Sequence, residues 1–156
     1  KARLQKWLGK RGLQLNEKKT RLVNIRQEGI RFLGFSLTSR TSRRGRRYLH
    51  IEPHPKSRQE LRDRLGEILH HGSLWRPVAD VVKEVNQVLR GWAGYFQWGH
   101  SSRVCSQMMS YSRNRLRRWL WRKHDCRRGL WTRYTDQRLH EKYGLWTLPL
   151  SGSWSH

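Results

Sequence analysis

A regular apolar stripe over residues 78–96 constrains the fold of this chain more than any other sequence feature. Its apolar side chains recur at steps of 4, 3, 4, 3 and 4 residues: Val78, Val82, Val85, Leu89, Trp92 and Phe96. This spacing predicts an α-helix that begins near Pro77 and buries one face. Gly91 and Gly94 lie off the stripe, on a narrow face that another helix or a nucleic-acid backbone could approach closely.

Two further segments predict helices that share a core with the first. Residues 57–69 open with the S-x-x-E capping pattern of Ser57 and Glu60 and continue with apolar residues at helical spacing. Residues 104–124 carry one apolar side, and from Arg113 onward most of the remaining positions are basic. A short helix is also expected over residues 138–143. Three long helices around one core are the natural result.

The residues before Pro53 and Pro55, which mark the clearest internal boundary, favour strands. The first residues predict the end of a helix that stops at Gly12. Three strand-like runs follow, at residues 21–25, 30–37 and 48–51, and residues 27–29 form a turn between the first two. The sequence therefore predicts an α+β fold, in which short antiparallel β hairpins precede a three-helix bundle.

Net charge is the second strong constraint. The chain has 34 lysines and arginines against 11 acids, a net charge of +23. Such a charge strains a compact fold unless an anionic partner neutralises it, and the dense phosphates of nucleic acid suit that role best. No stretch approaches about 18 consecutive apolar residues, so we expect no membrane partner. Cys105 and Cys126 lack zinc or redox spacing, and we expect free thiols in a reducing cytoplasmic or organellar interior.

The basic residues concentrate in two segments. Loop 39–47 holds five arginines and no acid, and the sequence has no acid between Glu84 and Asp125 to neutralise helix 104–124. Basic segments can simply be solvated, but in a chain this basic we favour phosphate contacts. Trp121 lies among arginines and is the ring expected to be exposed for base stacking. The candidate nucleic-acid-binding residues are Arg40, Arg43, Arg44, Arg46, Arg47, Arg113, Arg115, Arg117, Arg118, Trp121, Arg122 and Lys123.

The sequence offers little for metal or covalent chemistry. It has no phosphate-cradling glycine loop, no nucleophile elbow and no zinc-ligand spacing. It also lacks the clustered carboxylates that a two-metal polymerase or nuclease needs. Taken alone, the chain is typical of a binding module, with no metal ligands and no cofactor of its own.

Two blocks of the sequence resemble group II intron reverse transcriptases. GLQLNEKKT at residues 12–20, followed by IRFLGF at 30–35, resembles the last palm motifs of that family. VNQVLRGWAGYF at residues 85–96, followed by LRRW at 116–119, resembles its maturase-specific thumb, called domain X. The order and spacing of the blocks make the resemblance specific, and it extends to about Trp146.

The resemblance implies roles for individual residues. Lys19 matches a family lysine near the incoming nucleotide and would be an accessory residue there; the alternative is a surface charge beside a hairpin. A second segment matches the primer grip, which holds the primer end by close backbone approach. Its residues are Phe32, Leu33, Gly34 and Phe35. The alternative for Gly34 is an ordinary strand bulge.

The resemblance also implies domains and partners. Residues 1–52 would end the palm, with motif D-like and primer-grip segments, residues 53–125 would form the thumb, and residues 126–156 a partly ordered tail. The expected partners are group II intron RNA, the primer–template duplex, and the rest of the palm and fingers. The palm's catalytic aspartates would lie before Lys1, so this chain alone should be inactive, and Mg²⁺ is expected only in the complete polymerase.

Two other functions stay open. A thumb from a CRISPR-associated or other defence reverse transcriptase would share these blocks without a role in splicing. A stand-alone structural RNA-binding protein would share the charge and the aromatic residues. The genes beside the parent gene would distinguish a defence reverse transcriptase from a group II intron protein. Palm motifs upstream in the same reading frame would exclude a stand-alone RNA-binding protein.

Overall fold

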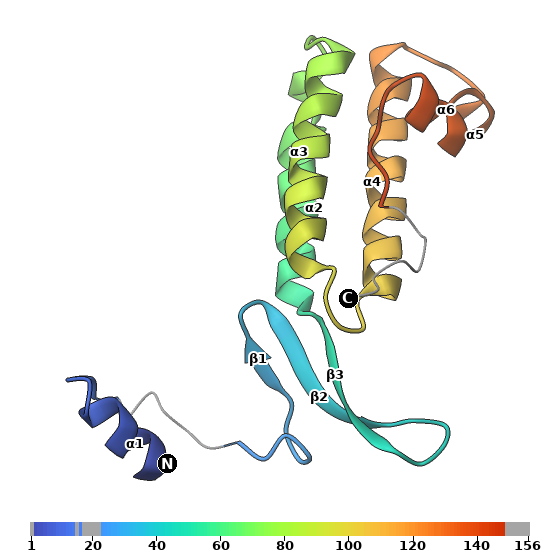
Figure 1. Ribbon diagram of the computed structural model, residues 1–156. Helices are drawn as coiled ribbons and strands as arrows, with labels where there is room; N and C mark the ends of the chain where they lie inside the picture. Colours follow the sequence, from blue (N-terminus) through green and yellow to red (C-terminus); the bar gives the residue numbers. More distant parts are fainter. Residues whose placement is uncertain (1, 15, 17–22, 149–156) are drawn as a thin grey trace.

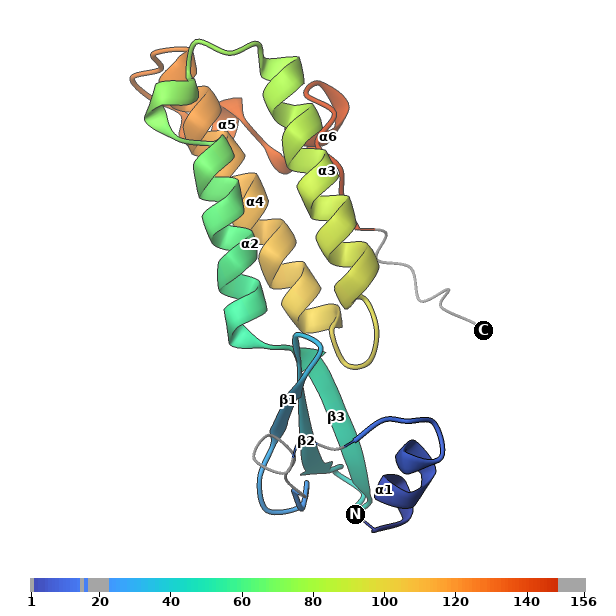
Figure 2. The same ribbon diagram turned by 90° about the vertical axis from the view of Figure 1, so that its left-hand side faces the viewer.

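The computed structural model describes residues 2–14, 16 and 23–148 (Figure 1). A three-stranded antiparallel sheet precedes a bundle of helices, which confirms the predicted α+β fold class. The sheet and α1 lie at one end of the helical bundle in both views (Figure 1; Figure 2). The elements are α1 (Ala2–Gly9), β1 (Ile30–Phe32), β2 (Phe35–Thr41), β3 (Arg47–Pro53), α2 (Pro55–Ile68), the 3-10 turn η1 (His71–Ser73), α3 (Val78–Phe96), α4 (Ser102–Lys123), α5 (Leu130–Arg133) and α6 (Asp136–Glu141).

The sheet is a meander in which the strands follow one another in space in the order β1-β2-β3. Phe32 of β1 pairs with Phe35 of β2, so only Leu33 and Gly34 connect these strands. Both connecting residues have positive φ, 47° and 79°. Two successive residues with positive φ are typical of a type I′ turn, whose twist matches that of the flanking strands.

This tight turn corrects the strand boundaries predicted from sequence. The single strand predicted over 30–37 is wrong, because the chain reverses at the turn and forms two paired strands instead. The strand predicted over 21–25 is not formed at residues 23–25, and residues 21 and 22 lie outside the described residues. The predicted third strand is present as β3 and is longer than expected.

Helices α2, α3 and α4 pack around one hydrophobic core (Figure 2). The stripe predicted on α3 faces this core: four of its side chains are buried, and Val78 and Trp92 are partly buried against it. Cys105 and Cys126 are free thiols, as predicted. Both are buried, and burial raises the pKa of the Cys105 thiol. None of the described helices is both long and apolar enough to cross a membrane.

The start of α2 differs from the predicted capping box. His54 is the N-cap residue: its Nδ1 accepts a hydrogen bond from the Lys56 backbone N–H at 3.1 Å. Pro55 takes the first helical position, where its missing N–H costs nothing. Ser57 lies inside the helix, and its Oγ donates to the carbonyl of Gly34 at 3.0 Å. The predicted role of Ser57 as a cap is therefore wrong; this side chain joins the helix to the sheet.

The chain after α4 folds back over that helix and completes the core. Leu139 and Leu145 are buried among the core side chains, and α4 contacts both α5 and α6. Asn86 of α3 fixes the end of this segment. Its Nδ2 donates to the Gly144 carbonyl at 2.8 Å, and its Oδ1 accepts from the Trp146 backbone N–H at 2.7 Å. The domain boundary predicted after residue 125 stays a prediction, but the hydrophobic core continues past it.

The β1–β2 turn contacts the end of the bundle through backbone and aromatic groups. The Gly34 carbonyl accepts hydrogen bonds from Ser57 and, at 2.8 Å, from the His54 backbone N–H. A Cβ at Gly34 would lie 3.1 Å from the Phe96 ring, which explains why this position holds glycine. The centre of the Phe35 ring lies 5.1 Å from the centre of the Phe96 ring. The turn is therefore held against the C-terminal end of α3.

The loop after α3 fixes the other side of the sheet. The His100 backbone N–H donates to the Ile51 carbonyl at 2.7 Å, and the Ile51 N–H donates to Nδ1 of His100 at 3.3 Å. Gly99 has a φ of +74°, and a Cβ there would lie 2.8 Å from the Ile51 carbonyl oxygen. This close approach needs glycine, so the loop acts as a short extra partner for β3.

Candidate nucleic-acid interface

The β2–β3 hairpin ends in a basic connection, which we call the hairpin tip. Ser42 shapes it: its N–H donates to the Arg46 carbonyl at 2.8 Å, and its Oγ accepts from the Arg46 N–H at 3.1 Å. The hairpin tip consists of the exposed residues Arg40, Arg43, Arg44, Arg46 and Arg47. Among the described residues, Arg40 alone of this set forms an ion pair, with Glu52 at 3.6 Å. The other four are exposed and form no ion pair with any described residue.

Arg117 of α4 lies inside the protein, with a side chain that is 3% exposed. Its Nε donates to the Tyr134 carbonyl at 2.6 Å, its Nη1 to Oδ1 of Asn114 at 2.7 Å, and its Nη2 to the Asp136 carboxylate. The guanidinium also lies 4.3 Å from the centre of the Trp131 ring. Because the protein itself occupies all three nitrogens, Arg117 is placed in the core rather than on a phosphate-binding surface.

Asp136 also neutralises Arg113, whose Nε lies 3.0 Å from its second carboxylate oxygen. The sequence has no acid between Glu84 and Asp125, and we expected the charge of this helix to lack a local partner. That expectation is wrong, because the fold brings Asp136 back to α4 from beyond the helix.

Two further basic side chains of α4 donate hydrogen bonds to backbone carbonyl groups in the segment after α2. Nη2 of Arg115 donates to the Leu69 carbonyl at 3.5 Å. The Lys123 ammonium donates to the carbonyls of Leu74 and Arg76 at 2.6 and 2.8 Å. Both side chains therefore satisfy carbonyl groups that follow α2, as cations commonly do at helix ends.

The exposed cations among those predicted on α4 are Arg118 and Arg122. They are four residues apart and so lie on the same side of the helix. Neither forms an ion pair with another described residue. Of the predicted arginines on this helix, these two have the placement that phosphate binding needs.

The placement of Trp121 corrects the prediction of an exposed ring. Its side chain packs against the hydrophobic core, and its Nε1 is buried without a hydrogen-bond partner among the described residues. The exposed tryptophans of the described residues are instead Trp7, Trp75, Trp98 and Trp131. Trp75 is 81% exposed, more than any of the other three. Trp131 is already stacked on Arg117. The basic neighbours of Trp121 in sequence predicted an exposed ring, but α5 and α6 pack against α4.

The predicted primer-grip segment forms the β1–β2 turn at the sheet end of the bundle. Phe32 and Leu33 are 61% and 66% exposed, whereas Phe35 is partly buried. The Leu33 carbonyl accepts a hydrogen bond from the Tyr95 hydroxyl at 3.0 Å, so part of this backbone is already engaged. The predicted accessory residue Lys19 lies outside the described residues, as does its neighbour Thr20.

The glycines of α3 lie on an open face. No described atom outside the local helix backbone comes within 4 Å of a Cβ placed at Gly91 or Gly94. The close approach by another helix that we considered is therefore not seen in the described part of the chain. At the sheet–bundle junction, by contrast, a Cβ at Gly34 or Gly99 would meet neighbouring atoms closely.

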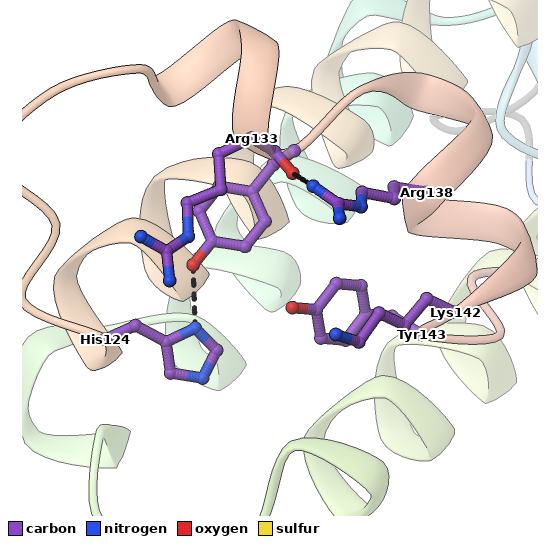
Figure 3. Close-up of a pocket in the computed structure, with 6 residues that line it drawn as sticks. His124, Arg133, Arg138, Lys142 and Tyr143 are labelled. Atoms are coloured by element: carbon purple, nitrogen blue, oxygen red, sulfur yellow. Dashed lines mark hydrogen bonds between the residues drawn. The ribbon is translucent and has the colours of Figure 1, made fainter.

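A cluster of cations that the sequence interpretation missed surrounds a cavity beside the end of α4 (Figure 3). We call it the cationic cavity; its volume is about 440 Å³. It is lined by His124, Arg133, Tyr134, Arg138, Lys142 and Tyr143. Apart from the short helix predicted over 138–143, we had treated the chain after Cys126 as a weakly patterned tail. The signal available was the recurrence of basic residues beside two tyrosines.

The hairpin tip and the Arg118–Arg122 pair lie towards opposite ends of the molecule. The β2–β3 hairpin points away from the bundle, whereas the C-terminal end of α4, with α5 and α6, lies at the far end (Figure 1). Helix α4 has 22 residues, so it alone separates the two regions by roughly 33 Å. The two basic segments predicted from sequence therefore do not form one local patch.

Comparison with known families identifies the helical part of the chain. Residues 58–138 match the family model described as the group II intron, maturase-specific domain. The match covers α2 to α4, α5 and the start of α6, and includes the buried Arg117 and its partner Asp136. A search of curated proteins finds no match. Because the family model covers more than half of the chain, the protein belongs to the group II intron maturase-specific domain family.

Proposed function

We propose that this chain is the RNA-binding thumb portion of a group II intron reverse transcriptase. In this role it binds intron RNA for splicing and grips the primer–template during reverse transcription. One observation carries the proposal: exposed arginines without ion pairs among the described residues lie on the β2–β3 hairpin at one end of the molecule and on α4 of the matched maturase region towards the other. Phosphates would supply the missing negative charge.

The separation of the two basic regions supports an extended RNA contact. One RNA that reaches both the hairpin tip and the Arg118–Arg122 pair would run along the length of the bundle. Such distant sites share no side chains, so their contributions to binding free energy should add. Phosphate contacts fix the position of the RNA but carry no sequence information, which suits recognition of a folded RNA by its shape.

The β1–β2 turn is the part that we assign to the primer–template. Its exposed Phe32 and Leu33 form an apolar surface, which the exposed ring of Tyr95 extends. The space beside Gly34 faces the Phe96 ring, so the exposed Phe32 and Leu33 are the part of the turn that nucleic acid could meet. Holding the turn against α3 would keep it in a fixed position relative to the bundle.

The experiment measures binding of labelled group II intron RNA as salt is raised from about 50 to about 200 mM. The test variants are Arg43→Gln/Arg44→Gln at the hairpin tip and Arg118→Gln/Arg122→Gln on α4. Lys83→Gln/Arg90→Gln on α3 removes the same charge from another exposed surface. Each test variant should weaken binding about tenfold and reduce the slope of log affinity against log salt by roughly 1.4–1.8, the value for two phosphate contacts.

Three results would oppose the proposal. Affinity that does not change with salt would exclude phosphate-dominated binding. Equal losses in the test and control variants would show that total charge, rather than the two ends, determines affinity. Equal affinity for intron RNA and an unrelated folded RNA of the same length would support RNA binding but contradict the maturase role. Competition by an RNA/DNA duplex tests the primer–template part separately.

A further inference from the structure

The cationic cavity collects positive charge without a carboxylate to balance it. Arg133, Arg138 and Lys142 line it together with His124, and no aspartate or glutamate of the described chain is among its lining residues. Asp125 and Glu141 are each next in sequence to a lining residue but do not line the cavity, and Asp136 is bound to Arg113 and Arg117. Figure 3 shows His124 and Arg133 on one side of the opening, and Arg138, Lys142 and Tyr143 on the other.

Hydrogen bonds hold the walls of the cavity in place. Nη1 of Arg138 donates to the Arg133 carbonyl at 3.0 Å, which joins α6 to the end of α5. The buried Tyr134 bonds through its hydroxyl to Nδ1 of His124 at 2.7 Å and donates to the Leu120 carbonyl at 3.4 Å. The tyrosine and Arg138 therefore hold part of the wall in place, and the exposed Arg133 and Lys142 line the same space.

The electrostatics show that these charges oppose one another. Burial lowers the pKa of His124, and the positive charges of Arg133, Lys123 and Lys142 lower it further. Cations gathered in this way repel, and a bound anion would remove that repulsion. The volume of about 440 Å³ lies within the usual range of about 300–1,000 Å³ for ligand sites.

We propose that the cationic cavity is a phosphate-binding site, and that it takes one phosphate group of an RNA strand. Two guanidinium groups and an ammonium provide the charged N–H donors that phosphate oxygens accept, and a guanidinium can bind two of those oxygens at once. The tyrosine hydroxyls and the imidazole add neutral polar groups on the same walls. The assignment to RNA rests on the proposed function; binding of phosphate itself does not.

The test compares two variants of the full chain that lose the same charge. Arg133→Gln/Lys142→Gln removes two exposed cations from the cavity without touching the buried Tyr134. Arg127→Gln/Arg128→Gln removes two exposed cations from the same segment, outside the cavity lining. Thermal unfolding checks that both variants fold like the parent chain. The first probe is inorganic phosphate. Its binding is monitored through the backbone amide chemical shifts of the chain.

In the parent chain and in Arg127→Gln/Arg128→Gln, phosphate should shift amide signals mainly within residues 124–143. Arg133→Gln/Lys142→Gln should weaken this response about tenfold, because charge-assisted hydrogen bonds supply most of the affinity. An absent response, shifts spread over all basic segments, or equal losses in both variants would overturn the site.

RNA oligonucleotides distinguish the sources of the phosphate group. If an oligonucleotide with a 5′-hydroxyl displaces inorganic phosphate, the cavity takes internal phosphates of the strand. If displacement needs a 5′-phosphate, the cavity takes the terminal group. If neither oligonucleotide competes, the assignment to RNA is overturned and free phosphate is the ligand.

The two proposals fail in different ways. Intron RNA that binds the parent chain, but loses equal affinity in both variants, would remove the cavity from the RNA interface and leave the thumb function intact. A chain that binds inorganic phosphate in the cavity but no intron RNA would overturn the thumb function and leave the anion site.

Discussion

Asp136 at the start of α6 binds the buried guanidinium of Arg117 on α4, across 19 residues of sequence. The same carboxylate lies 3.0 Å from Nε of Arg113. Since α4 contains no acid of its own, one carboxylate neutralises two of its arginines and joins the C-terminal segment to the bundle. This relationship engages Arg113 and Arg117 within the protein, whereas Arg118 and Arg122 of the same helix stay exposed.

We expect Asp136→Asn to lower the free energy of unfolding by about 1–3 kcal/mol, because it leaves the buried Arg117 charge without its carboxylate. The loss should fall short of that for a fully buried pair, since the Asp136 side chain is 56% exposed. Urea denaturation measures it. Asp125→Asn, which removes an exposed acid without a described ion pair, should change stability by less than about 0.5 kcal/mol. Equal effects of the two variants would contradict this account.

Gly34→Ala should destabilise the sheet–bundle junction more than the same change in an open turn. Gly34 and Gly45 share a positive φ, +79° and +74°, so alanine carries a similar backbone strain of roughly 1–2 kcal/mol at each. A Cβ at Gly34 also meets Phe96 at 3.1 Å, whereas no atom lies within 4 Å of one at Gly45. We expect Gly34→Ala to cost about 1 kcal/mol more in denaturant unfolding. Equal losses would show that the junction adapts freely.

The histidine of the cationic cavity should make stability depend on pH. His124 has a pKa below its usual 6.5, because it is partly buried and lies near Arg133, Lys123 and Lys142. The unfolded chain therefore binds more protons near that pH, and the stability that neutral His124 contributes is present above about 6.5 and is lost as the pH falls. An NMR titration of the imidazole measures the pKa directly.

Arg133→Gln should raise the pKa of His124 towards its ordinary value, because it removes the largest of the three charge effects. Arg127→Gln is the control, because Arg127 is not among the charges that lower the pKa of His124. A His124 pKa that stays unchanged in Arg133→Gln would show that Arg133 does not contribute to the shift.

Leu139→Ala should destabilise the whole bundle, although residue 139 lies beyond the predicted end of the thumb. Its side chain is 0% exposed and belongs to the common core, so truncation should cost about 2–5 kcal/mol. Unfolding should remain a single transition. The exposed Gln137→Ala on the same helix should change stability little. Two separate transitions would make the segment after α4 an independent unit.

Helix α3 illustrates how far the sequence predicts the fold. Its apolar steps depend on local geometry alone, because 3.6 residues per turn determine which side chains share a face. The predicted stripe and the buried face therefore agree. The same reasoning predicted the core positions of α2, including Leu61 and Leu65.

The failures share a physical cause, which is that the decisive partner lies far away in the sequence. Arg117 and Trp121 look exposed on a basic helix until α5 and α6 cover it. The reversal at Leu33 requires a non-glycine residue with positive φ, which composition does not favour, and contacts with Tyr95 hold it there. The cationic cavity likewise forms from residues that become neighbours only when the chain folds back.

The folding of the last described segment over α4 affects how such a protein can diversify. Residues that pack in the bundle, such as Leu116 and Trp119, are constrained by volume and tolerate little change. The covering segment instead presents exposed cations such as Arg133 and Arg138 from a short loop-rich stretch. If the cationic cavity binds phosphate as proposed, substitutions there would change anion binding while the helices keep their geometry, so a lineage could change its RNA contacts without rebuilding its scaffold.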